Sequence, residues 1–320
     1  MAERVDIKTG YYCNNWCRFC VQAHNRKYGD RTTDEIKESL RTAREENIAS
    51  VVFTGGEFTI RKDAIHLVSY ATKIGYKEIQ LQSNGRMFSD LSYLKKLIEA
   101  GANQFSPALH GSTPEIHDYL TRAPGAFRQT TQGIRYIRRL KMKVISNSVI
   151  VKANLRDAPD IAKLLVELDV MQFQFAFVHA MGNAFENYNS IMPIATIAAP
   201  YIKKGLRIGA LNHKIVMAEA MPYCIMKGYE RFVSELYIPE TIVKEKDFWV
   251  KNFNYVKKVE GKTLFPQCKD CRFRLICEGP WREYSDEMGH DEFRPVIGKL
   301  IESKEEILNN NKEFPLVPEI

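Results

Sequence analysis

Three cysteines lie close together near the start of the chain. Cys13, Cys17 and Cys20 are spaced C-x₃-C-x₂-C, all within eight residues. Thiolate sulfur is a soft ligand that suits iron–sulfur clusters, and three thiolates on one loop can hold three corners of a [4Fe–4S] cube. The fourth iron then stays open, and an open position is typical of catalytic metal sites. A zinc site short of one ligand and a set of buried structural thiols are the alternatives.

A second motif follows the cysteine loop. The short apolar run 50–53 predicts a buried strand, and Gly55, Gly56 and Glu57 come directly after it. Two glycines allow a backbone to approach a ligand closely, and Glu57 places a carboxylate where the strand ends. In parallel α/β proteins the site lies at the carboxyl ends of the strands. We therefore expect these residues to face a ligand.

Short polar side chains follow the next predicted strand, residues 78–82. Ser83 and Asn84 stand there before a glycine. A plain Asn-Gly turn explains the same residues without a ligand. Their place at a strand end makes them candidates for binding one.

Together these motifs resemble the radical S-adenosylmethionine (radical SAM) superfamily, in which the open iron chelates the amino and carboxylate groups of SAM. The resemblance implies that SAM is cleaved to a 5′-deoxyadenosyl radical, which removes a hydrogen atom from a substrate. It makes Phe19 the aromatic residue that precedes the last cysteine, and it assigns the Gly-Gly-Glu turn to the SAM amino group. It also implies contacts to SAM further along the chain, with the end of the sixth predicted strand packing against the SAM adenine. The expected SAM-binding residues are Phe19, Gly55, Gly56, Glu57, Ser83, Asn84, Ser148, Val178, His179 and Gly182.

Four further cysteines lie late in the chain. Cys268, Cys271 and Cys277 are spaced C-x₂-C-x₅-C, and Cys224 lies upstream. Four thiolates can bind zinc tetrahedrally or a closed [4Fe–4S] cluster. The spacing resembles the auxiliary-cluster modules called SPASM or twitch domains, and the four cysteines imply a single auxiliary [4Fe–4S] cluster, as in the shorter twitch form. Since four cysteines would complete its ligation, that cluster is expected to move an electron, for example from a substrate radical. The alternatives are that it only supports the fold or relays reducing electrons inward.

Apolar runs and helical periodicity alternate along most of the chain, which predicts a parallel α/β sheet with right-handed crossovers. Either a doubly wound sheet or a barrel fits this alternation. The resemblance selects a partial (β/α)₆ TIM-like barrel over residues 1–205, and the late cysteines predict a small C-terminal auxiliary-cluster module over 206–320. An exposed helix is expected at 303–312. Predicted strands are 5–12, 50–53, 78–82, 104–109, 144–151 and 172–178, and predicted helices begin at 33, 63, 90, 127, 158 and 193.

No catalytic base stands out in the sequence. His110, Asp118, Glu186 and Tyr188 are candidates. His110 follows the fourth predicted strand and could move protons or line a substrate cavity, but a structural histidine is equally consistent. The phase of the strand that contains Ser148 is open, since alternate residues face opposite ways.

Composition limits the class of protein. The chain has 320 residues, seven cysteines and a net charge of +7, with no run of 18 apolar residues and no signal-peptide pattern. We expect a cytoplasmic protein whose cysteines bind metal in a reducing compartment. The charge permits an anionic partner such as nucleic acid without requiring one. The sequence indicates neither membrane binding nor a particular oligomeric state.

The substrate is expected to be a peptide or protein side chain that is oxidised or crosslinked. A small molecule, in a dehydrogenase or a cofactor-biosynthesis enzyme, is the alternative, and tRNA modification is a third. An electron donor such as flavodoxin or ferredoxin is an expected partner. The rival from another class is a non-catalytic zinc or nucleic-acid-binding module, which would contain zinc and no iron.

Overall fold

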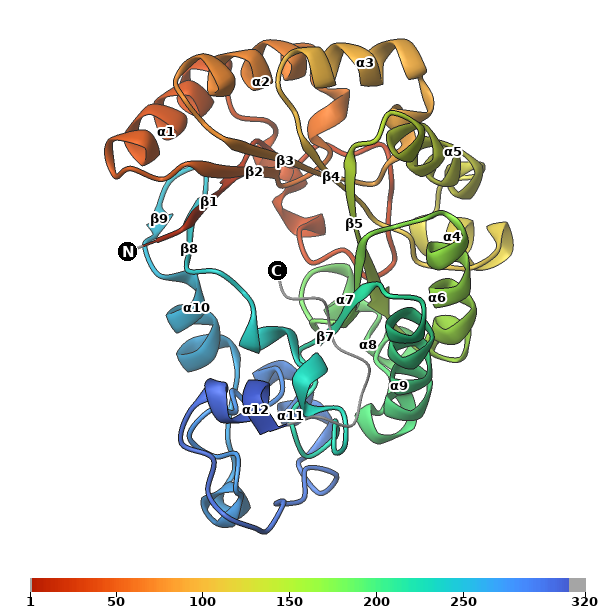
Figure 1. Ribbon diagram of the computed structural model, residues 1–320, viewed down its shortest axis with the longest axis vertical. Helices are drawn as coiled ribbons and strands as arrows, with labels where there is room; N and C mark the ends of the chain where they lie inside the picture. Colours follow the sequence, from red (N-terminus) through yellow and green to blue (C-terminus); the bar gives the residue numbers. More distant parts are fainter. Residues whose placement is uncertain (1, 311–320) are drawn as a thin grey trace.

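The strands form one sheet whose order follows the chain. The computed structural model describes residues 2–310. Within them, nine strands are hydrogen-bonded in the order β7-β6-β5-β4-β3-β2-β1-β8-β9 (Figure 1). A doubly wound sheet would reverse its strand order at a switch point. The uninterrupted parallel order from β1 to β7 instead confirms the expected α/β fold of a partial TIM-like barrel. The strands are β1 (Arg4–Lys8), β2 (Ser50–Thr54), β3 (Glu78–Ser83), β4 (Gln104–Pro107), β5 (Lys143–Ile150), β6 (Gln172–Phe177), β7 (Ile215–Glu219), β8 (Thr241–Lys244) and β9 (Trp249–Val250).

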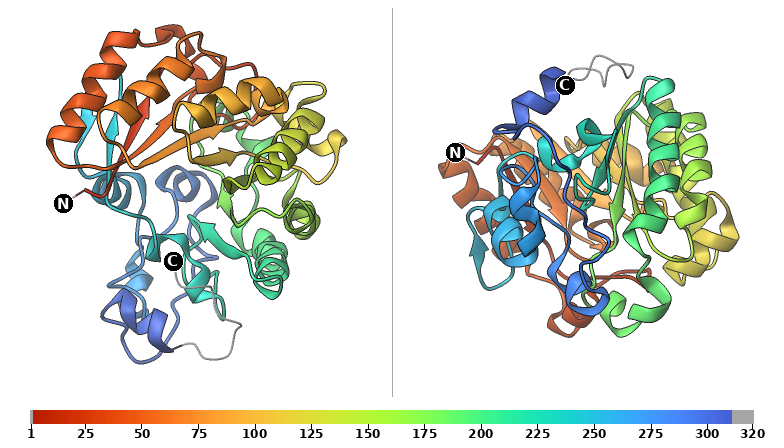
Figure 2. Two further views of the ribbon diagram at one scale, coloured as in Figure 1. Left: turned by 45° about the horizontal axis from the view of Figure 1, so that its top comes forward. Right: turned by 90° about the horizontal axis from the view of Figure 1, so that it is seen from below.

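Helices connect the parallel strands and cover the outer face of the sheet (Figures 1 and 2). None of the described helices combines the length and apolar character needed to cross a bilayer. The helices before β7 are α1 (Thr33–Glu45), α2 (Ala64–Lys73), α3 (Leu91–Glu99), α4 (Pro114–Thr121), α5 (Ala126–Arg139), α6 (Ala158–Glu167), α7 (Asn183–Glu186), α8 (Tyr188–Ile191) and α9 (Ala195–Leu211). The later ones are α10 (Phe253–Val256), α11 (Arg282–Met288) and α12 (Lys304–Asn310). The expected helix at 303–312 is α12, and residues 311–312 lie outside the described part of the chain.

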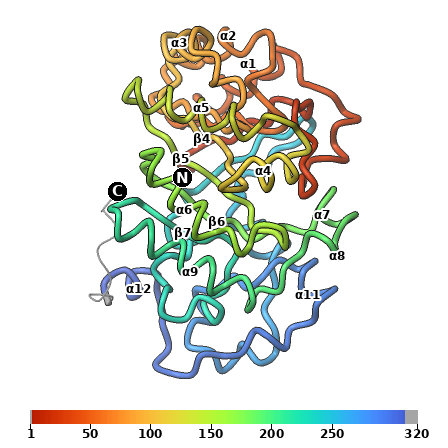
Figure 3. The backbone as a smooth tube through the Cα atoms, turned by 90° about the vertical axis from the view of Figure 1, so that its right-hand side faces the viewer, coloured from red at the N-terminus to blue at the C-terminus, as the bar shows by residue number. Residues whose placement is uncertain are grey.

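The sheet continues beyond the six strands expected. β7 pairs in parallel with β6, and β8 returns to pair in parallel with β1, with Arg4 opposite Thr241. In Figure 3 the cyan segment that contains β8 lies beside the red N-terminal part of the chain. Both strands were missed because they are short and no helix of ordinary length follows them. The boundary expected at residue 205 stays a prediction about domains, although the sheet extends past it.

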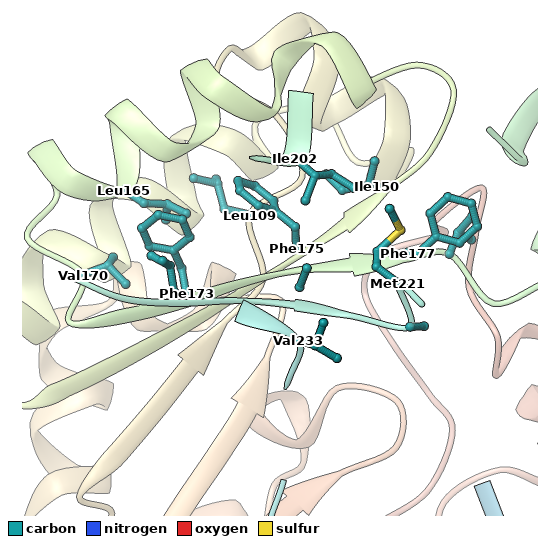
Figure 4. Packing of buried hydrophobic residues seen from close by; sticks show 14 of the residues in the cluster. Leu109, Ile150, Leu165, Val170, Phe173, Phe175, Phe177, Ile202, Met221 and Val233 are labelled. Atoms are coloured by element: carbon teal, nitrogen blue, oxygen red, sulfur yellow. The ribbon is translucent and has the colours of Figure 1, made fainter. Parts of the chain in front are cut away.

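The hydrophobic core lies between the sheet and the helices. Phe173 and Phe175 of β6 are fully buried, and Figure 4 shows Phe173 beside Leu165 of α6. Gly205 and Gly209 let α9 approach these rings, because a Cβ on Gly205 would lie 2.7 Å from Phe175 Cε2 and one on Gly209 would lie 2.5 Å from Phe173 Cζ. Two small residues on one helix face therefore set how closely α9 packs.

Replacing Gly209 by alanine should destabilise the protein, although alanine favours a helix by about 1 kcal/mol. The added methyl group would overlap the Phe173 ring, and overpacking of a rigid core typically costs about 1–3 kcal/mol. We expect urea unfolding to show a net loss of about 1 kcal/mol. Arg207→Ala, exposed on the same helix, is the control and should change stability by less than about 0.5 kcal/mol. A Gly209→Ala protein as stable as this control would contradict the packing argument.

Candidate functional site

The cysteine loop follows β1 and is held by backbone hydrogen bonds on two sides. Arg18 N donates to Leu120 O in α4 at 2.9 Å. From the other side, Asn183 donates from its backbone N to Cys20 O at 3.0 Å and from Nδ2 to Cys17 O at 2.8 Å. The loop is therefore fixed between the end of α4 and the segment that follows β6.

The three thiols lie close enough to influence one another. Burial, followed by the neighbouring Cys20 and Cys13, raises the pKa of Cys17. Burial and then Glu57 raise the pKa of Cys13 to about 11. A metal binds the thiolate form and releases these protons. A cationic metal group is what would make three neighbouring thiolates favourable in this buried loop.

The Gly-Gly-Glu turn packs directly on the start of the cysteine loop. Gly56 N donates to Gly10 O and Glu57 N donates to Tyr12 O, each at 2.7 Å. A Cβ on Gly56 would overlap Tyr12 O, and one on Gly55 would overlap Gly10 O. The close approach that these glycines permit is thus to the backbone of the chain itself. Their contact with SAM stays a prediction.

The Glu57 carboxylate joins the ends of β2 and β3. It is 3 % exposed and accepts hydrogen bonds from Ser83 Oγ at 2.8 Å, Asn84 N at 2.6 Å and Thr59 N at 3.0 Å. Burial raises the pKa of this carboxyl, while these donors act in the opposite direction. Glu57, Ser83 and Asn84, which lie at neighbouring strand ends, therefore form one hydrogen-bonded unit, and their contact with SAM stays a prediction.

Asn84 extends this unit to the cysteine loop. Its Nδ2 donates to Asn14 Oδ1 at 2.6 Å and lies 3.8 Å from Cys13 Sγ. Arg86 Nη1 donates to Asn14 O at 2.5 Å and to Asn15 Oδ1 at 3.0 Å. The sequence interpretation missed Arg86, whose only signal was its place in the turn after Asn84.

His179, an expected contact of the SAM adenine, is bound to the C-terminal part of the chain. Its ring stacks on Trp281 with centroids 3.9 Å apart and planes 7° apart. Its Nε2 lies 3.1 Å from Glu283 Oε2. Burial acts to raise the pKa of Glu283, but the hydrogen bond with His179 helps to lower it below its usual value. Trp281 Nε1 donates to Phe177 O at 3.4 Å. These contacts join the end of β6 to α11.

Val178 and Gly182 flank this residue. Val178 is 1 % exposed and belongs to the core. Gly182 has φ +54°, and a Cβ there would lie 2.6 Å from Cys20 O and 2.8 Å from Val21 O. Gly182 thus allows the segment after β6 to reach the cysteine loop. The contacts of Val178, His179 and Gly182 with adenine remain predictions.

His110 packs against the cysteine loop as a neutral ring. Its centroid is 4.7 Å from that of Phe19, and its Nδ1 accepts from Val149 N at 3.2 Å. Burial, and then His117, lower the pKa of His110 to about 3. Since Nδ1 accepts, the proton of the neutral ring is on Nε2. This geometry favours the structural interpretation of His110 over proton transfer.

The other candidate bases have little catalytic support. Asp118 accepts hydrogen bonds from Gly125 N and Phe127 N at 2.7 Å each, at the start of α5. Glu186 is exposed on α7. Tyr188 lies 3.3 Å through its hydroxyl from a backbone carbonyl of α11, and burial raises its pKa to about 12. Asp118 is positioned as a helix cap, and the raised pKa of Tyr188 makes it a poor base at neutral pH.

The structure fixes the phase of β5. Ser148 Oγ donates to Leu109 O at 2.5 Å, and Ser146 Oγ donates to Pro107 O at 2.9 Å. Both hydroxyls are therefore used within the sheet, whereas Asn147 lines its interior. The expected contact between Ser148 and SAM is not supported by this orientation, and Asn147 is the residue of β5 better placed to meet a ligand.

The four late cysteines line one apolar pocket. Burial raises the pKa of Cys224 to about 12, and Cys277, Cys271 and Cys268 add to this effect. Hydrogen bonds to sulfur help to set the potential of iron–sulfur clusters. Three such bonds are present: Phe265 N to Cys268 at 3.5 Å, Val296 N to Cys271 at 3.4 Å and Gly279 N to Cys277 at 3.4 Å.

Over residues 2–310, no three cysteine, histidine or acidic side chains are grouped as ligands of a single metal ion. A tetrahedral zinc site holds its sulfurs about 2.3 Å from one centre. A cube of four irons carries each sulfur on a different corner and requires a wider arrangement. The four late cysteines fit a cluster in their number, burial and N–H donors, and the three thiols of the N-terminal loop fit one in their number and spacing.

Polar side chains line the interior of the sheet around a cavity of about 470 Å³. TIM-barrel interiors are usually filled by branched apolar residues, and ligand sites commonly measure about 300–1,000 Å³. Asn147 Oδ1 is buried there with no hydrogen-bond partner in the described part of the chain. The sequence analysis did not predict this polar lumen, although amide side chains at alternate positions of the predicted strands indicated it. Its amide side chains are Gln80, Gln82, Gln104, Asn147, Gln172 and Gln174.

A buried carboxyl also faces the lumen. Glu219 ends β7, and its Oε2 accepts from Gln174 Nε2 at 3.0 Å. Burial raises the pKa of Glu219, and Lys257 opposes that rise. Lys257 and Arg4 also line the cavity.

Comparison with known proteins agrees with this geometry. The family model described as the Radical SAM superfamily matches residues 7–165, which contain the cysteine loop, the Gly-Gly-Glu turn and the Ser83–Asn84 turn. An AdoMet-dependent heme synthase of Oleidesulfovibrio alaskensis is 30% identical over 54% of this chain and 44% of the relative. A second one, of Methanosarcina barkeri, is 28% identical over 83% of this chain and 87% of the relative.

A PqqA peptide cyclase of Bradyrhizobium diazoefficiens is 28% identical over 59% of this chain and 50% of the relative. The chain thus spans about half the length of this relative and of the Oleidesulfovibrio protein. Streptococcus suis SuiB has been solved with S-adenosylmethionine, where it aligns with a TM-score of 0.65 and 15% identity over 92% of this chain and 76% of SuiB. It has also been solved with the precursor peptide SuiA, with a TM-score of 0.61 and 14% identity over 82% of this chain and 62% of SuiB. These likenesses show a shared fold.

Replacing Gly56 by alanine should displace the cysteine loop from the end of β2. The new Cβ would overlap the Tyr12 carbonyl, which is rigid backbone. If each set of cysteines holds one cluster, as the sequence predicts, iron bound after anaerobic reconstitution should fall by about half. Gly261→Ala is the control, because its Cβ would make only an ordinary 3.5 Å contact with Trp281. Full iron content in both variants would contradict this role of Gly56.

The low pKa of His110, about 3, makes stability depend on pH. Between that pKa and the unfolded value of about 6.5, the folded protein binds fewer protons than the unfolded chain. The stabilisation is complete above pH 6.5 and is lost as the pH falls through this window. We expect denaturant unfolding of the metal-free protein to show this fall, and a shallower one in His110→Gln. His117, with a pKa of about 4, keeps the slope from vanishing, and identical profiles for the two proteins would contradict the assignment.

Proposed function

Residues 7–165 identify this chain as a member of the radical SAM superfamily, and from that membership we propose that it cleaves S-adenosylmethionine reductively. Cys13, Cys17 and Cys20 would hold the [4Fe–4S] cluster. When bound, the cluster and SAM supply a 5′-deoxyadenosyl radical that removes a hydrogen atom from a substrate. The observation that carries the proposal is the hydrogen-bonded unit that places the ends of β2 and β3 against the cysteine loop.

The residues of this chain would orient SAM and keep water away from the radical. Asn84 reaches Asn14 and the neighbourhood of Cys13 from the end of β3, so a ligand at the open iron would meet its amide. Glu57 fixes the position of Asn84. Phe19 and His110, buried and in ring contact, would shield the loop from water.

The four late cysteines would hold an auxiliary [4Fe–4S] cluster. Their common pocket and the three N–H groups directed at sulfur suit thiolates that bind a metal group, and the C-x₂-C-x₅-C spacing favours a cluster over zinc. Complete ligation by the protein suits electron transfer, because no iron is left open for substrate. A reduced flavodoxin or ferredoxin would supply the electron for SAM cleavage.

The substrate would lie in the lumen, and its lining favours a peptide or protein segment. Side-chain amides donate and accept hydrogen bonds, as a peptide backbone does. Heme carries carboxylates, which basic residues recognise best. The lumen is lined by the basic residues Arg4 and Lys257 and also by acidic side chains such as Glu78 and Glu219. This mixture of charges is poorly suited to a strongly anionic ligand. The PqqA cyclase and SuiB, by their names, act on or bind peptides.

A small molecule made in cofactor biosynthesis is the second candidate. The match to the heme synthase of Methanosarcina barkeri covers most of both chains. No comparable observation favours a dehydrogenase of small alcohols, tRNA modification or a non-catalytic zinc module.

Anaerobically reconstituted protein should form 5′-deoxyadenosine from SAM with dithionite. Cys13→Ala should abolish this product, whereas Cys271→Ala should retain it while bound iron falls from about eight to about four atoms per chain. Iron-free protein that binds zinc, or a Cys13→Ala protein that still forms the product, would overturn the proposal.

The substrate class can be tested without knowing the substrate. An extract from cells grown in D₂O should transfer deuterium into 5′-deoxyadenosine. Transfer should disappear when the extract is digested with protease and should survive dialysis. The opposite pattern, protease-resistant and lost on dialysis, would select the small-molecule candidate.

A further inference from the structure

Four charged residues, three of them buried and Glu278 partly exposed, form an ion network beside the late cysteines. Lys262 Nζ pairs with Glu235 Oε1 and lies 3.0 Å from Glu278 Oε2. Lys257 Nζ lies 3.5 Å from Glu278 Oε2 and 3.9 Å from Glu235 Oε1. Lys257, Lys262 and Glu235 are 6 %, 2 % and 5 % exposed. The ion network therefore contains two cations and two anions that are largely removed from water.

The ion network adjoins both the four-cysteine pocket and the lumen. Glu278 follows Cys277 directly in the chain, and the positive charge of Lys262 opposes the rise that burial causes in the pKa of the Cys277 thiol. On the other side, Lys257 lines the lumen. Trp281 lies between the ion network and His179, with Lys262 Nζ 5.2 Å from its ring centroid. The charges are thus located between the expected substrate cavity and the expected auxiliary cluster.

Stability alone does not account for these charges. Burying four ions is unfavourable unless each is paired, and replacing such a group by apolar residues of similar volume is often neutral or stabilising. Paired charges in a low-dielectric region act strongly on any neighbouring group that changes its own charge. A four-cysteine cluster is such a group, because it becomes more negative by one unit when it gains an electron. Net charge and surroundings are known determinants of cluster potentials.

We propose that the ion network sets the reduction potential of the group held by the four late cysteines, with Lys262 stabilising its reduced form and Glu278 its oxidised form. This inference rests on the auxiliary cluster of the proposed function. The redox step is a one-electron reduction of the cluster by an added reductant, with no bond made or broken. Lys262 and Glu278 act on the cluster through their charges, which are of opposite sign.

The test is an EPR-monitored redox titration of reconstituted protein in which Cys13, Cys17 and Cys20 are replaced by alanine, so that only the auxiliary cluster contributes. At a fixed applied potential, Lys262→Gln should lower the ratio of reduced to oxidised cluster at least tenfold, which is 59 mV for one electron. Glu278→Gln should raise that ratio. Combining both substitutions should bring the ratio back towards that of the parent, since the two charges removed are of opposite sign.

Two controls separate charge from structure. Lys262→Arg keeps the charge and should keep the potential, and Lys258→Gln removes an exposed neighbouring charge and should shift the ratio by less than about threefold. Shifts of the same sign for Lys262→Gln and Glu278→Gln, or no shift in variants that retain their iron, would overturn the inference and leave the auxiliary cluster standing. Parent protein without iron at the late cysteines would instead refute the auxiliary cluster itself.

Discussion

The candidate site depends on a short stretch of backbone pairing between the cysteine loop and the Gly-Gly-Glu turn. Two 2.7 Å hydrogen bonds, Gly56 N to Gly10 O and Glu57 N to Tyr12 O, fix the loop against the end of β2. This pairing is possible only where neither glycine carries a side chain. It also aims the Glu57 carboxylate at the end of β3, so that the positions of three chain segments follow from one contact.

The two groups of cysteines are connected through the end of β6. Asn183 bonds to carbonyls of Cys17 and Cys20, while His179, only four residues earlier, stacks on Trp281 and pairs with Glu283. The segment after β6 is therefore a shared support. A shift of the C-terminal part would therefore reach the cysteine loop through only a few residues.

Local features of the site could be predicted from the sequence, and long-range ones could not. The cysteine spacing and the turn around Glu57 are determined by adjacent residues, and strong periodicity predicted the first six strands. The pairing of β8 with β1 joins residues more than 230 positions apart, and no local sequence pattern predicts it. The same limit applies to His179 on Trp281 and to the ion network. The alternation of residues along β5 could be read from the sequence. Which face of β5 meets the lumen, and so where Ser148 points, depends on the neighbouring strand.

The polar lumen changes what the barrel interior contributes to folding. Apolar burial is concentrated between the sheet and its helices, and the amides inside the sheet add little to it. Substitutions at those inner positions should therefore cost little stability, since large losses come from core packing and broken buried networks. A protein built in this way can acquire a new ligand through mutations of the cavity wall while its scaffold stays unchanged. This separation of scaffold from lining gives evolution a simple route to diversify the chemistry of one fold.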